Sequence, residues 1–211
     1  MTNYTLVLDK TTKAFGRRII FKELSYTFTN GNVYGIAGKN GAGKSTLVKI
    51  IAGLISPTNG KINHFVDDTL LEIDHLHNHI GFVSPYLVLY DEFTAIENLF
   101  YLCKIRGLLY DKKFAENLLN EVTLFDRRND LVKTYSSGMK QRLKYAFALV
   151  HSPSLIILDE PTSNLDSFGK DIVYNFINNL GKDKLVIVAS NEQSDLAVCP
   201  QIIEIEKFNK L

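Results

Sequence analysis

The sequence predicts an α/β fold built on a mostly parallel sheet. Short, wholly apolar runs at residues 155–158 and 185–189 are separated by a segment of helical periodicity at 172–180. Runs without polar alternation are typical of strands that helices cover on both faces, as in parallel sheets. Strands that alternate with helices along the chain favour parallel strands joined by crossover helices.

The first part of the chain predicts strands of a second kind. Residues 5–9 and 24–29 read as strands, Asn30 and Gly31 make a turn, and an apolar strand follows at 33–37. We expect these N-terminal strands to form an antiparallel part beside the parallel sheet. A further turn is expected around Asn59 and Gly60.

The middle of the chain changes character. Residues 95–122 suit two helices with a break at Gly107. We therefore expect one domain over residues 1–211, in which residues 1–84 and 150–211 form a core lobe and 85–149 an inserted helical lobe.

Composition narrows the classes of function. The 211 residues have 45% hydrophobic content, enough for a core, and a net charge of +1 with dispersed basic residues, so we expect no nucleic-acid partner. Cys103 and Cys199 are too few for a disulfide or metal framework, which favours a reducing cytoplasm. The sequence shows no signal peptide and no apolar run of the length that spans a bilayer, so a membrane link is expected only through a partner.

A glycine-rich run, GKNGAGKST, lies between the strand 33–37 and a helix. Its glycines allow positive φ and turn successive amides inward, its lysine can reach the β and γ phosphates, and its serine offers a hydroxyl to Mg²⁺. The helix that follows has an apolar stripe (Leu47, Ile50, Ile51 and Leu54), with Gly53 as its expected stop. We predict a triphosphate site formed by Gly38, Lys39, Asn40, Gly41, Ala42, Gly43, Lys44, Ser45 and Thr46.

Two carboxylates follow the buried strand 155–158. Asp159 and Glu160 come at its C-terminal end, the edge at which α/β proteins bind ligands. We expect Asp159 to hold Mg²⁺ with Ser45, and Glu160 to polarise the water that attacks the γ phosphate.

A third segment, YSSGMKQR at 135–142, precedes a helix, and alone it predicts only a capped helix start. The order of GKNGAGKST, YSSGMKQR, LIILDEP and SNLD resembles the nucleotide-binding domain of ABC transporters over essentially the whole chain. The resemblance implies a RecA-like P-loop NTPase fold with ATP and Mg²⁺ bound. It also implies a sandwich dimer of two copies, in which Ser136 and Gly138 contact the ATP of the opposite subunit and 163–166 links the two sites. Phe15 matches the aromatic residue that stacks on adenine; a core position is the alternative.

The chain departs from that family at two positions. Pro85 stands near the position of a glutamine that senses Mg²⁺ and the membrane partner, and Ser84 is only a weak substitute. Asn191 matches a histidine that bonds the γ phosphate. We predict slow hydrolysis with Glu160, Lys44 and Asn191 as the catalytic groups, or else a degenerate, regulatory site.

The resemblance implies the ATPase subunit of a membrane transporter. The form of the motifs is similar to small exporter ATPases of the haem-exporter-like and multidrug types, held at the cytoplasmic side of the cell membrane by transmembrane subunits. A soluble ABC ATPase of an assembly machine is the alternative. DNA-repair and ribosome-acting ABC proteins usually need coiled coils or tandem cassettes, and kinases and GTPases have no reason to carry YSSGMKQR.

Two further segments have alternative interpretations. The apolar segment 85–90, PYLVLY, is either an exposed docking groove for a transmembrane partner or a buried strand or loop. His75, His77 and His79 would share one face of a strand, where they would either bind zinc or copper or lie in a solvated segment.

Overall fold

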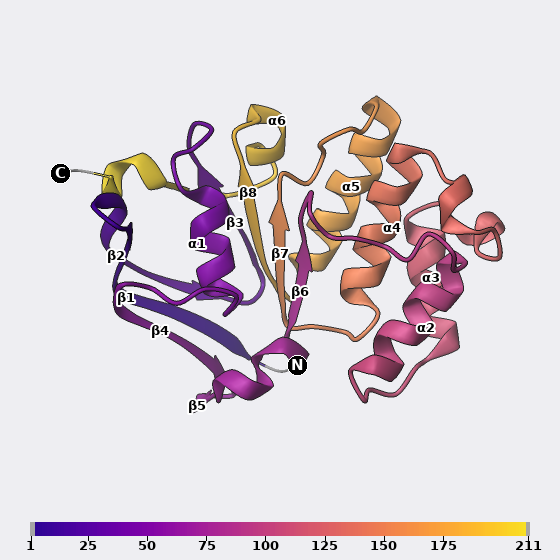
Figure 1. The fold of residues 1–211 in the computed structure, drawn as a ribbon, viewed down its shortest axis with the longest axis horizontal. Helices are drawn as coiled ribbons and strands as arrows, with labels where there is room; N and C mark the ends of the chain where they lie inside the picture. The colour runs from indigo at the N-terminus through magenta and orange to yellow at the C-terminus, as the bar shows by residue number, and fades with distance from the viewer. Residues whose placement is uncertain (1–2, 210–211) are drawn as a thin grey trace.

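The computed structural model describes residues 3–209, which form two sheets and a group of helices (Figure 1). Five parallel strands make the central sheet in the order β6 (Ile80–Val83), β7 (Leu155–Asp159), β8 (Leu185–Ser190), β3 (Asn32–Ala37) and β9 (Gln201–Glu204). Residues of β7 alternate between two apolar cores, one on each face of the sheet. The predicted α/β fold with a buried parallel sheet is confirmed.

The N-terminal strands form a separate antiparallel sheet. Its order is β2 (Arg18–Thr29), β1 (Tyr4–Phe15), β4 (Asn59–Val66) and β5 (Thr69–Leu70). The strands β1 and β2 are much longer than the apolar runs that predicted them. Their pairing continues beyond the buried apolar residues into the more exposed end of the hairpin, near Phe15 and Arg18.

The turn expected at Asn59 and Gly60 is wrong, because both residues belong to β4. Gly60 has φ +83°, and a Cβ atom there would lie 2.3 Å from the carbonyl oxygen of Lys10. The glycine is therefore required by the close approach of β1, and it does not mark a turn.

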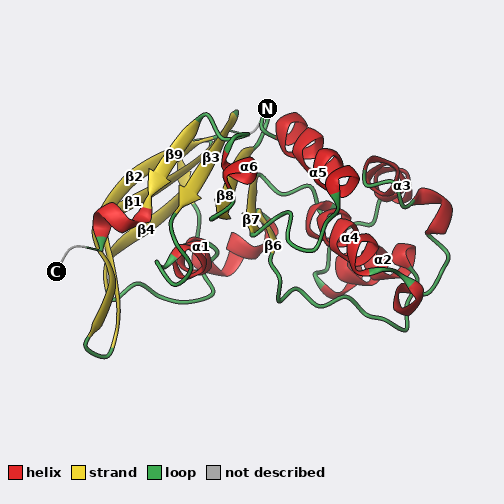
Figure 2. Ribbon diagram, turned by 90° about the horizontal axis from the view of Figure 1, so that it is seen from above, coloured by secondary structure: helices red, strands yellow, loops and turns green. Residues whose placement is uncertain are grey.

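Helix α1 (Lys44–Ile51) packs in one core with the antiparallel sheet and one face of the parallel sheet (Figure 2). It ends where predicted: Gly53 has φ +72°, and the amides of Gly53 and Leu54 bond to the carbonyls of Ile50 and Lys49 as in a Schellman motif. Leu54 lies beyond this stop and is exposed, so its place in the apolar stripe is a wrong prediction.

The helices α2 (Ala95–Ile105), α3 (Lys112–Glu121), α4 (Ser137–Leu149) and α5 (Ser167–Leu180) share the second core with the other face of the sheet. Figure 1 shows α2, α3 and α4 side by side at the end of the molecule away from the antiparallel sheet. Gly107, with φ +66°, follows α2 as expected. The lobe boundaries at residues 84/85 and 149/150 stay predictions, since this core continues across them.

The remaining elements are short. They include helix α6 (Gln193–Leu196) and the 3₁₀ helix at Ile73–Asn78. His75 and His77 lie on that 3₁₀ helix and His79 just after it, so the strand expected there is wrong. Cys103 and Cys199 are buried free thiols. Within residues 3–209, none of the helices combines the length and apolar character needed to cross a bilayer.

Candidate functional site

The glycine-rich loop connects β3 to α1 and depends on backbone conformations that favour glycine. Gly41 has φ +81° and Gly43 has φ +109°. A Cβ atom on Gly43 would lie 2.5 Å from Cγ2 of Ile20 on the neighbouring hairpin. Gly43 is also the N-cap of α1 and offers no side-chain acceptor, so the first amides of the helix remain directed at the loop. Loop and helix start together form an anion site.

Lys44 is the first residue of α1 and is nearly buried. Its ammonium group donates to the carbonyl oxygens of Gly38 at 2.9 Å and Lys39 at 3.4 Å. It also lies 3.5 Å from Oε1 of Glu160. The loop's own carbonyls therefore hold a cation at the centre of the site.

Ser45 and Asp159 meet across the site. The Ser45 hydroxyl donates to Oδ1 of Asp159 at 3.0 Å. Burial raises the pKa of the Asp159 carboxyl, and the hydrogen bond from Ser45 opposes that effect. A hydroxyl and a buried carboxylate are the hard oxygen ligands that Mg²⁺ prefers, so the pair fits this ion.

Glu160 follows β7 directly with φ +50°, and its amide bonds to the carbonyl of Ala189 at 2.8 Å. This left-handed conformation is uncommon for a residue other than glycine. Its Oε1 faces Lys44, and its Oε2 lies 3.3 Å from the Ser190 hydroxyl. The carboxylate is thus held by the Lys44 ammonium on one side and lies next to the Ser190 hydroxyl on the other.

These groups border one cavity of about 580 Å³ at the carboxyl ends of the parallel strands. The structure brings together a large part of the predicted site there: Asn40, Gly41, Gly43, Lys44, Ser45, Thr46, Asp159, Glu160 and Asn191. Gly38, Lys39 and Ala42 belong to the loop but do not line the cavity; the first two act through their carbonyls on Lys44. A polar cavity with a cation, a carboxylate pair and open amides suits a phosphorylated ligand with a divalent cation.

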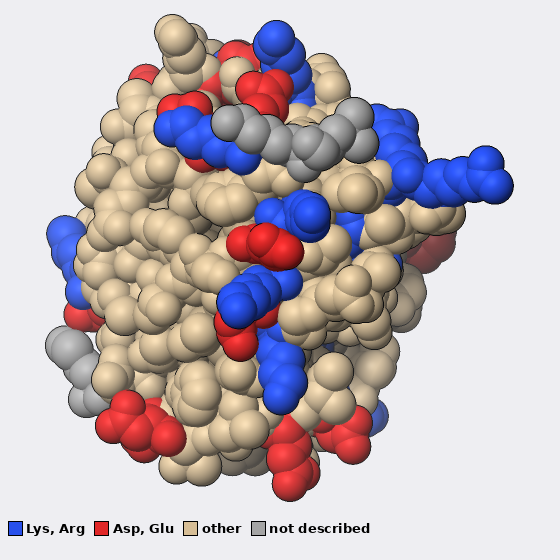
Figure 3. Space-filling view, turned by 90° about the vertical axis from the view of Figure 1, so that its left-hand side faces the viewer, with Lys and Arg blue, Asp and Glu red and all other residues tan. Residues whose placement is uncertain are grey.

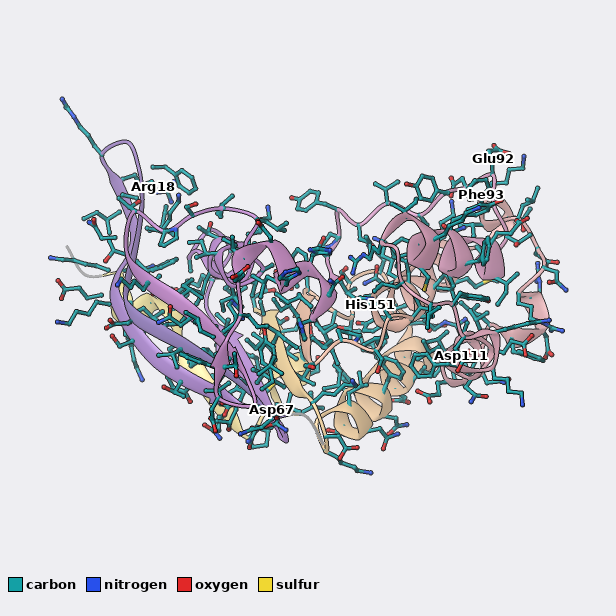
Figure 4. All side chains as sticks on the ribbon, turned by 90° about the horizontal axis from the view of Figure 1, so that it is seen from below. Arg18, Asp67, Glu92, Phe93, Asp111 and His151 are labelled. Carbon is teal, nitrogen blue, oxygen red and sulfur yellow. The ribbon has the colours of Figure 1, made fainter. Side chains whose placement is uncertain are left out.

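Phe15 is not among the residues that line this cavity. Its ring is 54% exposed, with the Lys13 ammonium 4.7 Å from the ring centroid. Arg18 and Ile20, on the other strand of the hairpin, line the cavity instead. Figure 4 places Arg18 at the turn end of that hairpin. The pairing of β1 with β2, which no motif marks, decides which hairpin residues reach the site.

Ser136 and Gly138 lie in a different hollow of about 290 Å³ at the start of α4. The Ser136 side chain caps this helix by accepting from the Met139 amide at 3.2 Å, as the capped-helix interpretation expected. Asn164, with φ +63°, borders both this hollow and the larger cavity. Within one chain the two predicted phosphate contacts are therefore separate.

The segment after β6 borders the large cavity through Pro85 and Tyr86. Lys144 of α4 donates to the carbonyls of Pro85 at 3.1 Å and Ser84 at 3.4 Å, which holds the segment in place. Tyr86 and Val88 are 77% and 79% exposed, but Leu89 is buried. The segment is therefore exposed at Tyr86 and Val88 and buried at Leu89, and docking of a partner on its exposed part stays a prediction.

Sequence reasoning missed a polar cluster beneath Glu160. Asp195 of α6 is 1% exposed and accepts hydrogen bonds from Thr162, Tyr174 and Ser190. The sequence shows only that Asp195 follows Asn191 by four positions, and in the sequence Asp195 resembles an ordinary surface residue. No group of three or more His, Cys, Asp or Glu among residues 3–209 could hold a metal ion, which leaves the three clustered histidines without a metal site there.

The charged surface is mixed where the antiparallel sheet faces solvent. Lys and Arg side chains lie among Asp and Glu side chains on this face (Figure 3). A face of mixed sign gives no stripe of the kind that binds a nucleic-acid backbone.

Comparison with known proteins agrees with this geometry. ABC transporter A family member 7 of Dictyostelium discoideum is 33% identical over 211 residues, covering 98% of this chain and 25% of that protein. Bacitracin transport ATP-binding protein BcrA of Enterococcus faecalis is 31% identical over 202 residues, covering 95% of this chain and 65% of that protein. The chain thus spans from a quarter to under two thirds of these relatives.

A solved structure shares the fold. The putative ABC transporter ATP-binding protein from Pyrococcus furiosus superposes with a TM-score of 0.83 at 22% identity, covering 97% of this chain and 98% of that one. The family model described as ABC transporter matches residues 21–163, more than half of the chain. With the glycine-rich loop and the Asp159–Glu160 pair in one cavity, the chain belongs to the ABC transporter family as an ATP-binding domain.

Proposed function

We propose that this chain binds ATP with Mg²⁺, hydrolyses the ATP, and drives a membrane exporter by dimerising around the nucleotide. The observation that carries the proposal is the convergence of Lys44, Ser45, Asp159 and Glu160 at one cavity. A cavity of this composition supplies positive groups for the phosphates, oxygen ligands for a cation and a carboxylate for water.

Each group has a distinct role in this proposal. The amides of residues 41–46 and the Lys44 ammonium bind the β and γ phosphates. Ser45 and Asp159 would hold Mg²⁺, which when bound would neutralise phosphate charge. Glu160 takes a proton from the attacking water, and the Asn191 amide, which lines the same cavity, donates to the γ phosphate.

A second copy would complete the site. Ser136 and Gly138 lie in a separate hollow at the start of α4, where a helix N-terminus and a hydroxyl suit an anion that another subunit carries. Asn164, in the segment 163–166, borders both hollows, so this segment is suited to link the two sites of a dimer.

The membrane partner is proposed from the relatives and from one surface. BcrA is described as a bacitracin transport ATP-binding protein, which supports a role in transport. The exposed side chains of Tyr86 and Val88 offer apolar contact beside the nucleotide cavity, where transmembrane subunits would dock and hold the chain at the cytoplasmic face of the membrane.

Phosphate release by the purified chain tests the catalytic part of this proposal. With ATP and Mg²⁺ we expect slow, saturable release that Lys44→Ala reduces at least tenfold, because this substitution removes the cation at the centre of the site. Equal release by both proteins would contradict the proposal. A detergent pull-down then distinguishes transmembrane subunits from the soluble partners of an assembly machine.

A further inference from the structure

Asp195 is a buried carboxylate whose described partners are hydroxyl groups. Its Oδ1 accepts from Thr162 at 2.7 Å and Tyr174 at 3.0 Å, and its Oδ2 accepts from Ser190 at 2.7 Å. None of the ion pairs that residues 3–209 form includes Asp195. A buried carboxylate without a cation is costly. Because this cost is borne directly beneath the nucleotide cavity, it favours a role of Asp195 in the chemistry of that cavity.

The Ser190 hydroxyl connects this carboxylate to Glu160. Its oxygen lies 2.7 Å from Asp195 Oδ2 and 3.3 Å from Glu160 Oε2, and it accepts from the Glu192 amide at 3.1 Å. A hydroxyl has one hydrogen and two lone pairs. Because the contact with Asp195 is shorter, we assign the hydroxyl hydrogen to that bond. One lone pair accepts from the Glu192 amide. The second lone pair faces Glu160, ready to accept a hydrogen bond.

We propose that Ser190 and Asp195 are positioning residues for ATP hydrolysis: Ser190 accepts a hydrogen bond from Glu160 once Glu160 is protonated, and Asp195 orients the Ser190 hydroxyl for that bond. The inference rests on the proposed function. In the step itself, the water oxygen bonds to the γ phosphorus, and the bond from that phosphorus to the β–γ bridging oxygen breaks. ADP keeps the electron pair, and one water proton moves to Glu160. The protonated carboxyl of Glu160 then donates a hydrogen bond through Oε2 to the Ser190 oxygen. The Ser190 hydroxyl keeps its own hydrogen and continues to donate it to Asp195.

The two oxygens of Glu160 face different partners, which supports this order of events. Oε1 lies 3.5 Å from the Lys44 ammonium, a donor, so it is suited to the ionised carboxylate. Oε2 faces an acceptor, so it is suited to carry the proton. Asp195 matters because it fixes the direction in which the Ser190 hydroxyl points.

Two substitutions break the chain of hydrogen bonds in different ways. Ser190→Ala removes the acceptor. Asp195→Asn keeps the size of the side chain but reverses its hydrogen bond with Ser190. Because Thr162 and Tyr174 both donate to the Oδ1 position, that atom must remain an oxygen. The new amide nitrogen therefore takes the Oδ2 position and donates to Ser190. Ser190 then turns its hydrogen towards Glu160 and cannot accept from it. We expect each variant to lower kcat about tenfold and to leave KM and ATP affinity within about twofold of wild type.

Tyr174→Phe is the matched control. It also removes one hydroxyl donor from Asp195, but Tyr174 makes no hydrogen bond to Glu160 or Ser190 among the described residues. A merely structural cluster predicts the same loss of kcat in Tyr174→Phe as in Ser190→Ala. Our inference predicts nearly unchanged kcat in the control, and recovery of much of the activity in Ser190→Thr, which keeps the hydroxyl.

The outcomes separate this inference from the function on which it rests. If wild type turns over ATP and Ser190→Ala and Asp195→Asn do so equally well, the inference is wrong and the ATPase proposal stands. Equal kcat losses in Tyr174→Phe and Ser190→Ala would also overturn it. If wild type neither binds nor hydrolyses ATP, the proposed function itself fails, and this inference with it.

Discussion

The Lys44 ammonium has partners in the structure that a triphosphate would replace. Two loop carbonyls and Glu160 Oε1 lie within 3.5 Å of it. Under the proposed function, phosphates that bind the ammonium would remove this cation from Glu160 and leave its carboxylate able to accept a proton from water. Lys44 would then hold the Glu160 carboxylate in place without ligand and release it when ligand binds.

Asn191 is the residue whose replacement should raise activity. Asn191 lines the cavity, and its side-chain amide can donate a hydrogen bond but carries no charge. In Asn191→His we expect kcat to rise by about threefold to tenfold at pH 7, because an imidazole can add positive charge next to the γ phosphate. The measurement is steady-state phosphate release, with Asn191→Gln as the control that lengthens the amide. An unchanged or lower rate in Asn191→His would count against a role for this position.

Most predicted residues of the site lie next to one another in the sequence, whereas Asn191 is identified only by the resemblance to the family. The loop 38–46 and the pair Asp159–Glu160 each follow a strand that ends at the same edge, so their meeting is a consequence of a parallel sheet. Arg18 and Asp195 reach the site through the pairing of a hairpin and the packing of a short helix. Those long-range placements leave no motif in the sequence.

At the scale of elements, α2 begins with a complete capping box. The Thr94 hydroxyl oxygen accepts from the Glu97 amide at 3.2 Å, and the Glu97 carboxylate accepts from the Thr94 amide at 2.8 Å. Both free amides at the start of the helix are satisfied. This box fixes where the helical lobe begins after the loop that follows β6.

Replacing Thr94 by alanine should lower stability and leave ATP binding unchanged. We expect a loss of about 1 kcal/mol, seen as a fall in Tm of about 2–4 °C in a thermal melt at pH 7. Hydrogen bonds from Thr94 lower the pKa of Glu97, so this stability is present above about pH 4.5 and is lost as the pH falls. Of the two bonds from Thr94 to the Glu97 carboxylate, Thr94→Ala keeps that of the backbone amide and removes only that of the hydroxyl, so the Tm difference should shrink in part at pH 3. Thr69→Ala is the control, and a difference as large at pH 3 as at pH 7 would argue against a stabilising bond between the Thr94 hydroxyl and the Glu97 carboxylate.

Within the segment 85–90 we expect Leu89 to contribute to the stability of the fold and Tyr86 to contribute to partner binding. Leu89 is buried, so Leu89→Ser should cost about 3 kcal/mol and lower Tm by about 6–12 °C. Tyr86 is exposed and contacts the Lys49 ammonium only at 5.3 Å from its ring centroid, so Tyr86→Ser should leave Tm within about 1 °C. We expect Tyr86→Ser to weaken co-purification of transmembrane subunits. Unchanged partner binding together with a large fall in Tm would favour a purely structural segment.

The sequence predicts helices and strands correctly where the apolar pattern is strong. It predicts them incorrectly where packing against a neighbouring element determines the local structure. The buried runs at 155–158 and 185–189 form β7 and β8, because short continuous apolar runs suit strands that are covered on both faces. In the sequence Gly60 indicates a turn, because only the neighbouring strand shows why a side chain cannot fit there. The histidine segment became a 3₁₀ helix because Leu76 alone turns into the core.

At the scale of the whole molecule, Gly138 tests whether two copies assemble around ATP. A Cβ atom there would meet its nearest neighbour, Cδ2 of Leu165, at 3.7 Å, an ordinary contact. Gly138→Ala should therefore fold as well as wild type, and alanine favours the helix. If the start of α4 approaches a phosphate of another subunit, the added methyl blocks that approach.

Size-exclusion chromatography with ATP and Mg²⁺ measures this effect in a Glu160→Gln background. We expect Glu160→Gln to elute as a dimer with ATP and as a monomer without it. The double variant Glu160→Gln with Gly138→Ala should stay monomeric in both conditions, although its Tm does not fall. An ATP-dependent dimer that forms equally well with Gly138→Ala would place the interface elsewhere on the molecule.

Calorimetry on Glu160→Gln tests the central claim, that one cavity binds ATP and that Glu160 takes the proton from water. Titration with ATP and Mg²⁺ should give saturable heat at one ATP per chain, with an affinity close to that of wild type, while phosphate release falls at least a hundredfold. Absence of binding heat in both proteins, or turnover by Glu160→Gln at the wild-type rate, would contradict the account.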